Sequence, residues 1–224
     1  MIGSMPASAR VESWNLEQMQ LRARMIVAPL ATLPRFVAGV DAAFSKDKST
    51  IFAAAVVYDR EAKQIVDIAH ATAPVTVPYI PGYLSFREGP AVLQAIGRLS
   101  KPFGAICFDG QGYAHPRRCG LATHLGVTLD VPSIGVGKSR LIGTFDEPET
   151  AAGSTSALVD REEPIGAVLR TKDRTRPLFV SVGHRVDLTS AVSLVLACVT
   201  RYRIPEPTRQ ADIEVAKLKR ASSG

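Results

Sequence analysis

Three apolar runs near the start of the chain are separated only by short polar segments. They span Phe36–Phe44, Ile51–Tyr58 and Ile65–Ala73. Runs of this length that are rich in Val, Ile and Phe are typical of β-strands, and such short connections favour antiparallel neighbours. The pattern therefore predicts three consecutive antiparallel strands and excludes an all-helical fold.

Helices and further strands alternate in the rest of the chain. The clearest helix has Asp187 as its N-cap, because apolar residues then recur at helical spacing from Leu188 to Val199. Other helices are expected at Trp14–Ala28, with Pro90 in the first turn of a helix reaching Leu99, after Pro116, and at Thr208–Lys219. Other strands are expected at Ala105–Phe108, Ser133–Val136, Ile165–Leu169 and Leu178–Val182. The acidic segment Asp146–Glu163 is expected to be a mobile loop or insertion.

The order of three strands, helix, strand, helix and strand is that of a ribonuclease H-like fold. We therefore expect an α/β protein whose central mixed five-stranded-type sheet has three antiparallel strands, then parallel strands, with flanking helices. The chain has 224 residues, which suffices for one substantial core. Residues 1–10 are small and polar and are expected to be a disordered tail, so that residues 11–220 form a single domain.

Composition narrows the class of partner. The formal net charge is +6, which favours a polyanionic partner. The longest apolar runs, such as Ile51–Tyr58, are too short to span a bilayer, and the first ten residues do not resemble a signal peptide. The three cysteines form no closely spaced pair, which is typical of free thiols in a reducing compartment. We expect a cytoplasmic monomer without a membrane partner.

Four acidic residues stand out by their positions. Asp41 is the lone acid in an apolar strand, and Asp109 follows the strand Ala105–Phe108 directly. In the expected fold the first and fourth strands are neighbours, so both carboxylates can lie at the sheet centre, while Glu88 and Asp212 can reach it from helices. Phosphodiester hydrolysis uses such clusters to hold one or two Mg²⁺ ions. The simpler alternatives, a solvated strand-edge Asp41 and a turn-capping Asp109, remain open.

Lys138 follows the strand Ser133–Val136 in the sequence Gly137-Lys138-Ser139. The same three residues end a nucleotide-binding P-loop, but that motif requires glycine where this chain has Pro132. We therefore reject an ATPase. At the end of the fifth strand, Lys138 can offset the charge of a leaving oxyanion, or it can be a solvated lysine.

Basic residues and one rigid loop offer contacts to nucleic acid. His115 can cap a helix or act in catalysis, Arg117 and Arg118 suit phosphate, and His184 is either structural or close to a phosphate. The loop with Pro78, Tyr79, Ile80 and Gly82 holds an aromatic ring between prolines. Such a stiff loop can wedge between stacked bases, although Tyr79 can also pack beneath the prolines.

Taken together, these segments resemble the endonuclease V family. The resemblance rests on six motifs that run in family order between about residues 12 and 215: Gly39-Val40-Asp41; Pro78 to Glu88; Asp109-Gly110 with His115-Pro116-Arg117-Arg118; Pro132 to Lys138; Gly183-His184-Arg185; and Pro205 to Arg209. The block around Tyr79 and the His-Pro-Arg-Arg block are the specific ones. Gln111 departs from the family, which often has His there, so a proton-transfer role at this position is unsupported while hydrogen bonding remains open.

The resemblance implies a Mg²⁺-dependent DNA repair endonuclease, with Mn²⁺ as a substitute ion. Its substrate would be deoxyinosine in DNA, and it would cut 3′ of this base to leave 3′-hydroxyl and 5′-phosphate ends. Inosine in RNA stays open as a substrate.

The motif positions also imply roles for individual residues. Asp41 and Asp109 would be the principal metal ligands, and Glu88 and Asp212 would complete or orient the shell. Tyr79 would separate the strands, with Pro78, Ile80 and Gly82 in its loop. Lys138 would stabilise charge at the cut, with His115 near the phosphate.

Two other readings are kept as alternatives. One is a nuclease of the same fold that acts on flaps or mismatches. The other is a non-catalytic protein that binds inosine-containing nucleic acid.

Overall fold

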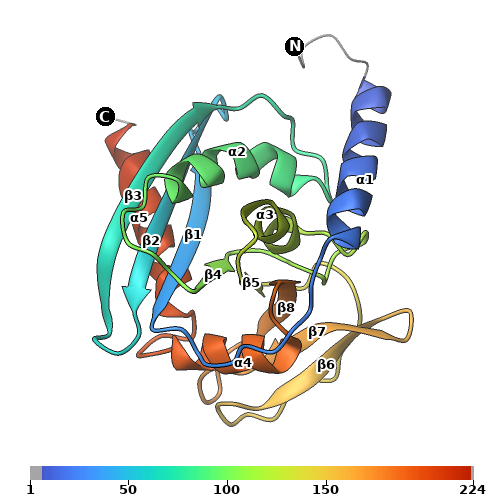
Figure 1. Ribbon diagram of the computed structural model, residues 1–224, viewed down its shortest axis with the longest axis vertical. Helices are drawn as coiled ribbons and strands as arrows, with labels where there is room; N and C mark the ends of the chain where they lie inside the picture. Colours follow the sequence, from blue (N-terminus) through green and yellow to red (C-terminus); the bar gives the residue numbers. More distant parts are fainter. Residues whose placement is uncertain (1–6, 223–224) are drawn as a thin grey trace.

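The three apolar runs form the first three strands of one eight-stranded sheet (Figure 1). The computed structural model describes residues 7–222. The strands are β1 (Phe36–Phe44), β2 (Thr50–Asp59), β3 (Gln64–Pro74), β4 (Ala105–Phe108), β5 (Ser133–Gly137), β6 (Thr155–Asp160), β7 (Glu163–Leu169) and β8 (Leu178–His184). The helices are α1 (Ala7–Ala23), α2 (Leu84–Ile96), α3 (Leu121–Leu129), α4 (Leu188–Ala197) and α5 (Glu206–Ala221).

The sheet order β3-β2-β1-β4-β5-β8-β7-β6 confirms the α/β prediction and the mixed sheet. Strands β1, β2 and β3 are antiparallel neighbours, and β4 pairs in parallel with both β1 and β5. The first strand therefore lies beside the fourth, as expected. Strands β8, β7 and β6 then extend the sheet by antiparallel pairing.

The sheet is larger than predicted, with eight strands instead of five. One of them, β6, lies in the segment Asp146–Glu163 that was expected to be a mobile loop, and it pairs with β7. Only Leu158 is fully buried in this strand, so the apolar alternation that marks a strand is missing. The connecting turn, Arg161-Glu162, has positive φ at both residues, a geometry that Asn-Gly would have signalled.

Helix boundaries also differ from expectation. Helix α1 begins at Ala7, so residues 7–10 are helical, while the rest of the predicted tail lies outside the described residues. Helix α2 begins at Leu84, which places Pro90 inside it and not in its first turn. Aromatic packing explains the early start, since Phe86 in the first turn stacks on Trp14 of α1 at 5.0 Å between ring centroids. Asp187 caps α4 as predicted, accepting a hydrogen bond from Ser190 N at 2.7 Å.

Helices cover both faces of the sheet (Figure 1). On one face, α2 and α3 pack on alternate residues of β1 and β4 such as Ala38 and Phe108. On the other face, α5 packs on β1 and β2 and α4 packs on β7 and β8, and the intervening residues of β1 and β4, such as Val37 and Cys107, lie in one buried cluster with residues of α4. This alternation explains why β1 and β4 read as continuous apolar runs, because both of their faces are buried.

Helix α5 approaches β1 closely because Gly39 has no side chain. A Cβ atom at Gly39 would lie 2.2 Å from the carbonyl carbon of Pro207, in the first turn of α5. Glycine is thus required here for direct contact between backbone segments. The contact brings α5, and Asp212 on it, next to the carboxyl half of β1.

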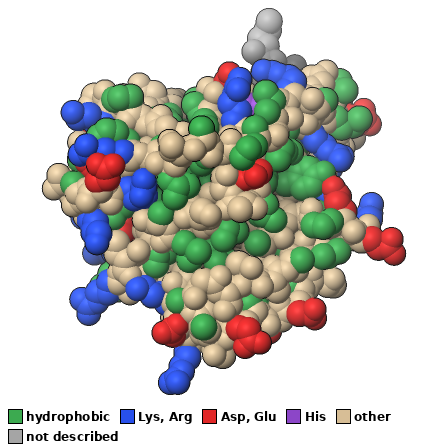
Figure 2. All heavy atoms as spheres, turned by 60° about the horizontal axis from the view of Figure 1, so that its bottom comes forward, with side chains coloured by type: hydrophobic (Ala, Val, Ile, Leu, Met, Phe, Trp, Pro, Cys, Tyr) green, Lys and Arg blue, Asp and Glu red, His purple; other side chains and the backbone are tan. Residues whose placement is uncertain are grey.

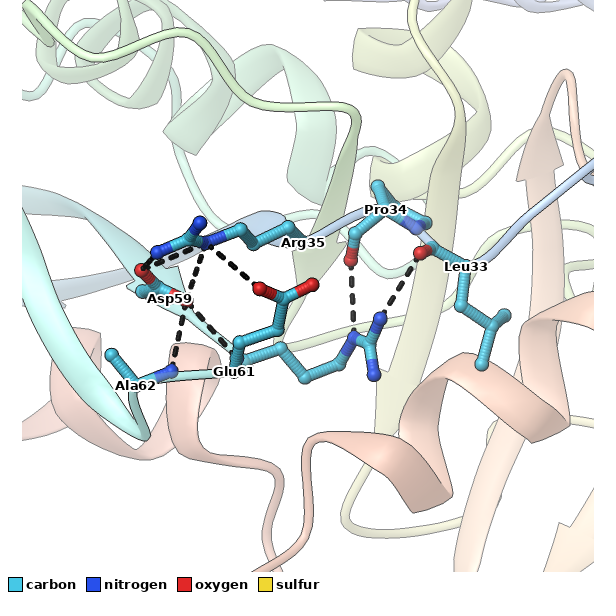
Figure 3. Close-up of polar contacts among 7 residues, drawn as sticks. Leu33, Pro34, Arg35, Asp59, Glu61 and Ala62 are labelled. Atoms are coloured by element: carbon cyan, nitrogen blue, oxygen red, sulfur yellow. Dashed lines mark hydrogen bonds and ion pairs between the residues drawn. The ribbon is translucent and has the colours of Figure 1, made fainter.

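A network of polar contacts fixes the edge of the sheet where β1 begins and β2 ends, opposite the edge at which β4 and β5 end (Figure 3). Arg35 donates to Asp59 at 2.7 Å and 3.1 Å, and Arg60 donates to the carbonyls of Leu33 and Pro34 at 3.0 Å and 3.1 Å. The network attaches the segment before β1 to the end of β2. None of these residues lies at the edge where β4 and β5 end.

Charge is unevenly spread over the surface. Lys and Arg side chains gather along the left edge of the face in Figure 2, while several Asp and Glu side chains lie along its lower right edge.

Within residues 7–222, no helix combines the length and apolar character needed to cross a bilayer.

Candidate active site at the ends of β4 and β5

Asp41 and Asp109 are brought together by the parallel pairing of β1 and β4. The last pair in register is Val40 with Phe108, so each carboxylate belongs to the next residue of its strand. The amide of Ala42 donates to Asp41 Oδ1 at 2.9 Å, which helps to orient this carboxylate. A short apolar strand that ends in an acid thus places its charge at the sheet edge, as the sequence predicts.

Lys138 and Asp212 join them from β5 and α5. The Nζ atom of Lys138 lies 2.5 Å from Asp109 Oδ2 and 3.8 Å from Asp212 Oδ1. Lys138 immediately follows β5, the parallel neighbour of β4, so its ammonium group lies at the same edge as Asp109. Two acidic residues that are far apart in sequence therefore meet at one ammonium group.

Glu88 reaches the cluster from α2, and its electrostatics show how close the acids are. Burial raises the pKa of Glu88 to about 8, and the charges of Asp41 and Asp109 add to the rise. Burial also raises the pKa of Asp41 to about 7, with repulsion from Asp109 contributing, while Lys138 opposes the shift. The pKa values of these two carboxyl groups are raised mainly because the groups are buried, and the neighbouring acids add to the rise.

The donor set suits a hard divalent cation. Asp41, Glu88, Asp109 and Asp212 supply oxygen ligands, and a cation bound among them would lower the pKa values of Asp41 and Glu88 that burial raises. Among residues 7–222, however, no three acidic, His or Cys side chains already surround a single metal-sized point. Asp109 is instead bonded to Lys138. The residues fit Mg²⁺ or Mn²⁺ by chemistry and location, and binding would require their side chains to adjust.

A pocket of about 300 Å³ opens beside this cluster. Asp109 and Lys138 line one side of it, and Tyr79 and Gly82 of the proline loop line another. The remaining wall includes Gly110, Gln111, Gly120, Leu121, Ser139 and Leu141. Sequence reasoning missed this pocket, because its lining comes from three segments that are separated in sequence, residues 79–85, 109–121 and 137–141. The only signal is the density of glycine at 110–112 and 135–137.

Gln111 connects two sides of the pocket. Its Nε2 donates to the carbonyl of Ser139 at 2.9 Å, which ties the loop after β4 to the loop after β5. This is a hydrogen-bonding role, the one that the sequence left open for a residue that cannot titrate near neutrality.

The proline loop presents Tyr79 to solvent. The Tyr79 side chain is 67% exposed, so it does not pack beneath the prolines. Pro78 is exposed as well and Ile80 half-buried, while Gly82 has a φ of +83° that favours glycine. The loop therefore forms a stiff rim on the pocket with an aromatic ring at its tip.

His115 and Arg117 hold this loop, which changes the roles expected for them. His115 Nε2 lies 3.1 Å from the carbonyl of Gly82, and Nδ1 accepts from the Arg117 amide at 3.2 Å. Arg117 donates to the same Gly82 carbonyl at 2.6 Å and to Gln18 Oε1 at 2.5 Å. Burial lowers the pKa of His115 to about 4, with the charges of Arg117 and Arg118 contributing. In this structure both residues hold the proline loop, and His115 also lines the pocket.

Arg118 was also expected at phosphate, but it is buried in a different place. It donates to Asp160 Oδ2 and Glu163 Oε2, both at 2.8 Å, and so supports the β6–β7 hairpin. Because both acidic partners lie more than forty positions downstream, the sequence motif could not reveal this function.

His184 lies at the wrong edge of the sheet for a phosphate contact. It pairs with Ser133, at the start of β5, whereas Lys138 follows the end of that strand. Its Nδ1 accepts from Ile26 N at 3.2 Å, and its Nε2 lies 2.9 Å from Asp130 Oδ1. These contacts favour the structural reading of the two that the sequence left open for His184.

Known proteins share this architecture and sequence. The family model for endonuclease V matches residues 19–213. The endonuclease V of Alkalilimnicola ehrlichii is 48% identical over 210 residues, which cover 94% of this chain and 92% of that protein. The endonuclease V of Methanothrix thermoacetophila is 51% identical over 185 residues, covering 83% and 81% of the two chains.

Solved structures agree. The crystal structure of endonuclease V from Streptomyces avermitilis superimposes with a TM-score of 0.91 at 41% identity, covering 95% of this chain and 94% of that one. The Ciona intestinalis endonuclease V in complex with a 24mer DNA containing an inosine followed by a ribo-adenosine has a TM-score of 0.83 at 27% identity, covering 95% and 99%. On the match of its sequence and fold, the chain belongs to the endonuclease V family of nucleases.

Proposed function

We propose that this protein is a divalent-metal-dependent endonuclease that recognises deoxyinosine in DNA and hydrolyses a phosphodiester bond on its 3′ side. The observation that carries the proposal is the adjacency of two features at one sheet edge. The carboxylate cluster with Lys138 directly adjoins a pocket of about 300 Å³ whose rim is the proline loop. A pocket of this volume suits one flipped base.

Each side of the site has a separate task. Asp41, Asp109, Glu88 and Asp212 would hold Mg²⁺, with Mn²⁺ as a substitute, and a cation bound there would supply Lewis acidity toward the phosphate oxygens. Lys138, as an ammonium group fixed at Asp109, would stabilise the negative charge that develops on the leaving oxygen.

The proline loop would act on the duplex. Tyr79 at its tip would enter the base stack and favour extrusion of a weakly paired base. His115 and Arg117, through their bonds to the Gly82 carbonyl, would keep the loop in place while Tyr79 enters the base stack.

Cleavage of matched oligonucleotides tests the proposal. Inosine- and guanosine-containing strands, as DNA and as RNA, would be incubated with Mg²⁺, with Mn²⁺ and with chelator. We expect nicking of inosine DNA that requires a divalent ion and is lost in Asp109→Ala. Nicking by Asp109→Ala at the wild-type rate would remove the site assignment, and inosine binding without any cleavage would favour the non-catalytic alternative.

The proposal also covers the oligomeric state, the biological role and the cellular location of the enzyme. We propose a monomeric enzyme that repairs deaminated adenine in the cytoplasm. The RNA arm of the cleavage assay decides whether inosine in RNA is a second substrate, and flap and mismatch substrates test the alternative nuclease specificity.

A further inference from the structure

A second groove begins where the active-site pocket ends. It has a volume of about 390 Å³ and shares Lys138 with that pocket. Its other side chains come from the segments that surround the start of β8, including Phe145, Glu147, Arg170, Arg174 and Arg176. Phe179 near the start of β8 pairs with Gly137, the neighbour of Lys138, so the groove lies at the same edge of the sheet as the carboxylate cluster.

Two arginines of this groove are uncompensated. The side chains of Arg174 and Arg176 are exposed and take part in no ion pair or side-chain hydrogen bond within residues 7–222. Arg170 is different, because it is buried and bonded to Glu147 at 2.7 Å and to the carbonyl of Pro148 at 2.9 Å. Arg170 therefore builds the floor of the groove, and Arg174 and Arg176 present free positive charge at its rim.

A second loop adds cations to the same rim. The Arg203 guanidinium donates to the carbonyls of Arg176 and Pro177 at 3.2 Å and 3.3 Å, and Thr171 Oγ1 donates to the carbonyl of Arg203 at 2.6 Å. These bonds join segment 170–177 to segment 199–205, so their charges are held together. Beyond Arg203, the ring of Tyr202 is 47% exposed, with the Arg201 guanidinium 5.6 Å from its centroid.

Among the residues that the structure describes, only one acidic side chain lines the groove, and it is already bonded to an arginine. Glu147 is bonded to Arg170, so it does not neutralise Arg174 or Arg176. Gathering cations in this way without counter-charges is unfavourable, and a polyanion that lies along them relieves the repulsion. A strand of nucleic acid has the required shape, because its phosphates form a row that leads away from the cleaved bond.

We infer that Arg174, Arg176 and Arg203 form a basic strip that binds backbone phosphates of the nucleic acid on one side of the cleaved bond. The inference rests on the proposed function for its substrate. It assigns a contact surface outside the pocket and the carboxylate cluster. Lys138 lies between the two regions, since it lines both the pocket and the groove.

The test uses the double variant Arg174→Gln/Arg176→Gln. Both side chains are exposed and unpartnered, and glutamine retains most of their length, so the fold is expected to persist. The matched control is Lys63→Gln/Lys101→Gln, which removes the same charge at the opposite edge of the sheet, where β2 meets β3 and where β4 begins. Thermal unfolding followed by circular dichroism checks that all three proteins fold.

Binding would be measured in EDTA, with duplexes that contain either one central deoxyinosine or deoxyadenosine in its place. Each phosphate contact contributes about 0.9 to the slope of log K against log salt concentration. We expect the slope of the double variant to fall by about 1 to 2 on both duplexes, while the control keeps the wild-type slope. A slope equal to that of the control would overturn the inference.

A second series shortens the duplex from one end and then from the other. The wild type and the control should lose affinity when the flank over the strip is removed, and the double variant should be insensitive to that removal. Equal sensitivity of all three proteins would also overturn the inference. A wild type that binds both duplexes without preferring inosine would overturn the proposed function alone, and one that binds neither would overturn both.

Discussion

Replacement of Gly39 by alanine should disturb the active site from the far side of β1. The added Cβ would lie 2.2 Å from the carbonyl carbon of Pro207 and 2.3 Å from its oxygen. Non-bonded carbon atoms prefer a separation of about 3.5 Å or more, so the first turn of α5 must retreat by roughly 1.3 Å. Pro207 is part of the backbone of this turn, so no side-chain rotation relieves the clash.

The retreat should cost stability and activity together. Forcing an extra methyl group into a packed contact typically costs about 1–3 kcal/mol. Asp212 lies on the displaced helix and its Oδ1 is 3.8 Å from Lys138 Nζ, a contact that a shift of this size would break. Misplacement of an active-site group by about 1 Å can reduce the rate about a hundredfold, so we expect kcat to fall by that order.

Urea unfolding and cleavage of inosine DNA would measure the two effects. Gly97→Ala is the matched control, because Gly97 has an ordinary helical φ of −64° and its added Cβ would lie 3.3 Å and 3.8 Å from the carbonyl oxygens of Leu93 and Gln94, far less close than at Gly39. We expect the control to unfold within about 1 kcal/mol of the wild type and to keep its activity. If Gly39→Ala were as stable and as active as the control, the close approach of α5 to β1 could not be what positions Asp212.

Three further predictions concern the site. Lys138→Met should lower kcat for inosine DNA by about 10²–10³ while binding in EDTA is retained; an unchanged kcat in single-turnover assays would contradict its role. Because the pKa values of Asp41 and Glu88 are raised to about 7 and about 8, the free energy of unfolding in EDTA should decline as pH rises from about 4, near their unfolded pKa values, and level off above about 8. Mg²⁺ should flatten this decline, and Glu88→Gln should reduce it. Urea titrations across pH measure the stability profiles of the wild type in Mg²⁺ and of Glu88→Gln in EDTA. Profiles equal to that of the wild type in EDTA would contradict the prediction. Tyr79→Ala should weaken the preference for inosine over ordinary duplexes, since stacking is worth roughly 1–3 kcal/mol per base, and equal losses on both duplexes in competition binding would refute the wedge.

The elements that the sequence predicted well are those whose signal is local. Strands β1 and β4 are continuous apolar runs, and the acids Asp41 and Asp109 stand out against them, so their meeting at one edge follows from the strand order alone. Lys138 follows the same logic at the end of β5. Strand β6 escaped prediction because only Leu158 in it is fully buried, and its pairing with β7 is set by a turn whose residues are unusual for that geometry.

The pocket escaped prediction for a different reason. Its lining comes from residues 79–85, 109–121 and 137–141, which close packing brings together, and glycine shows only that such packing is allowed. At Gly137, which lines the pocket, a Cβ would lie 2.2 Å from Nε2 of Gln111, on a different segment of the chain. No local pattern names that partner, so volume and shape appear only in the folded chain.

The cations show why a motif does not reveal which charges are available to a ligand. Arg117 and Arg118 lie in the most recognisable basic motif, yet one holds the proline loop and the other an ion pair with Asp160 and Glu163. Arg174 and Arg176 belong to no motif, and their charges have no partner within residues 7–222. A guanidinium group with most of its nitrogens bonded to carboxylates, carbonyls or amides has little left to offer a phosphate, whereas Arg203 uses only Nη1 in its bonds to the carbonyls of Arg176 and Pro177. The contribution of the net charge of +6 to substrate binding therefore depends on the unpaired arginines beside Lys138 more than on the conspicuous pair.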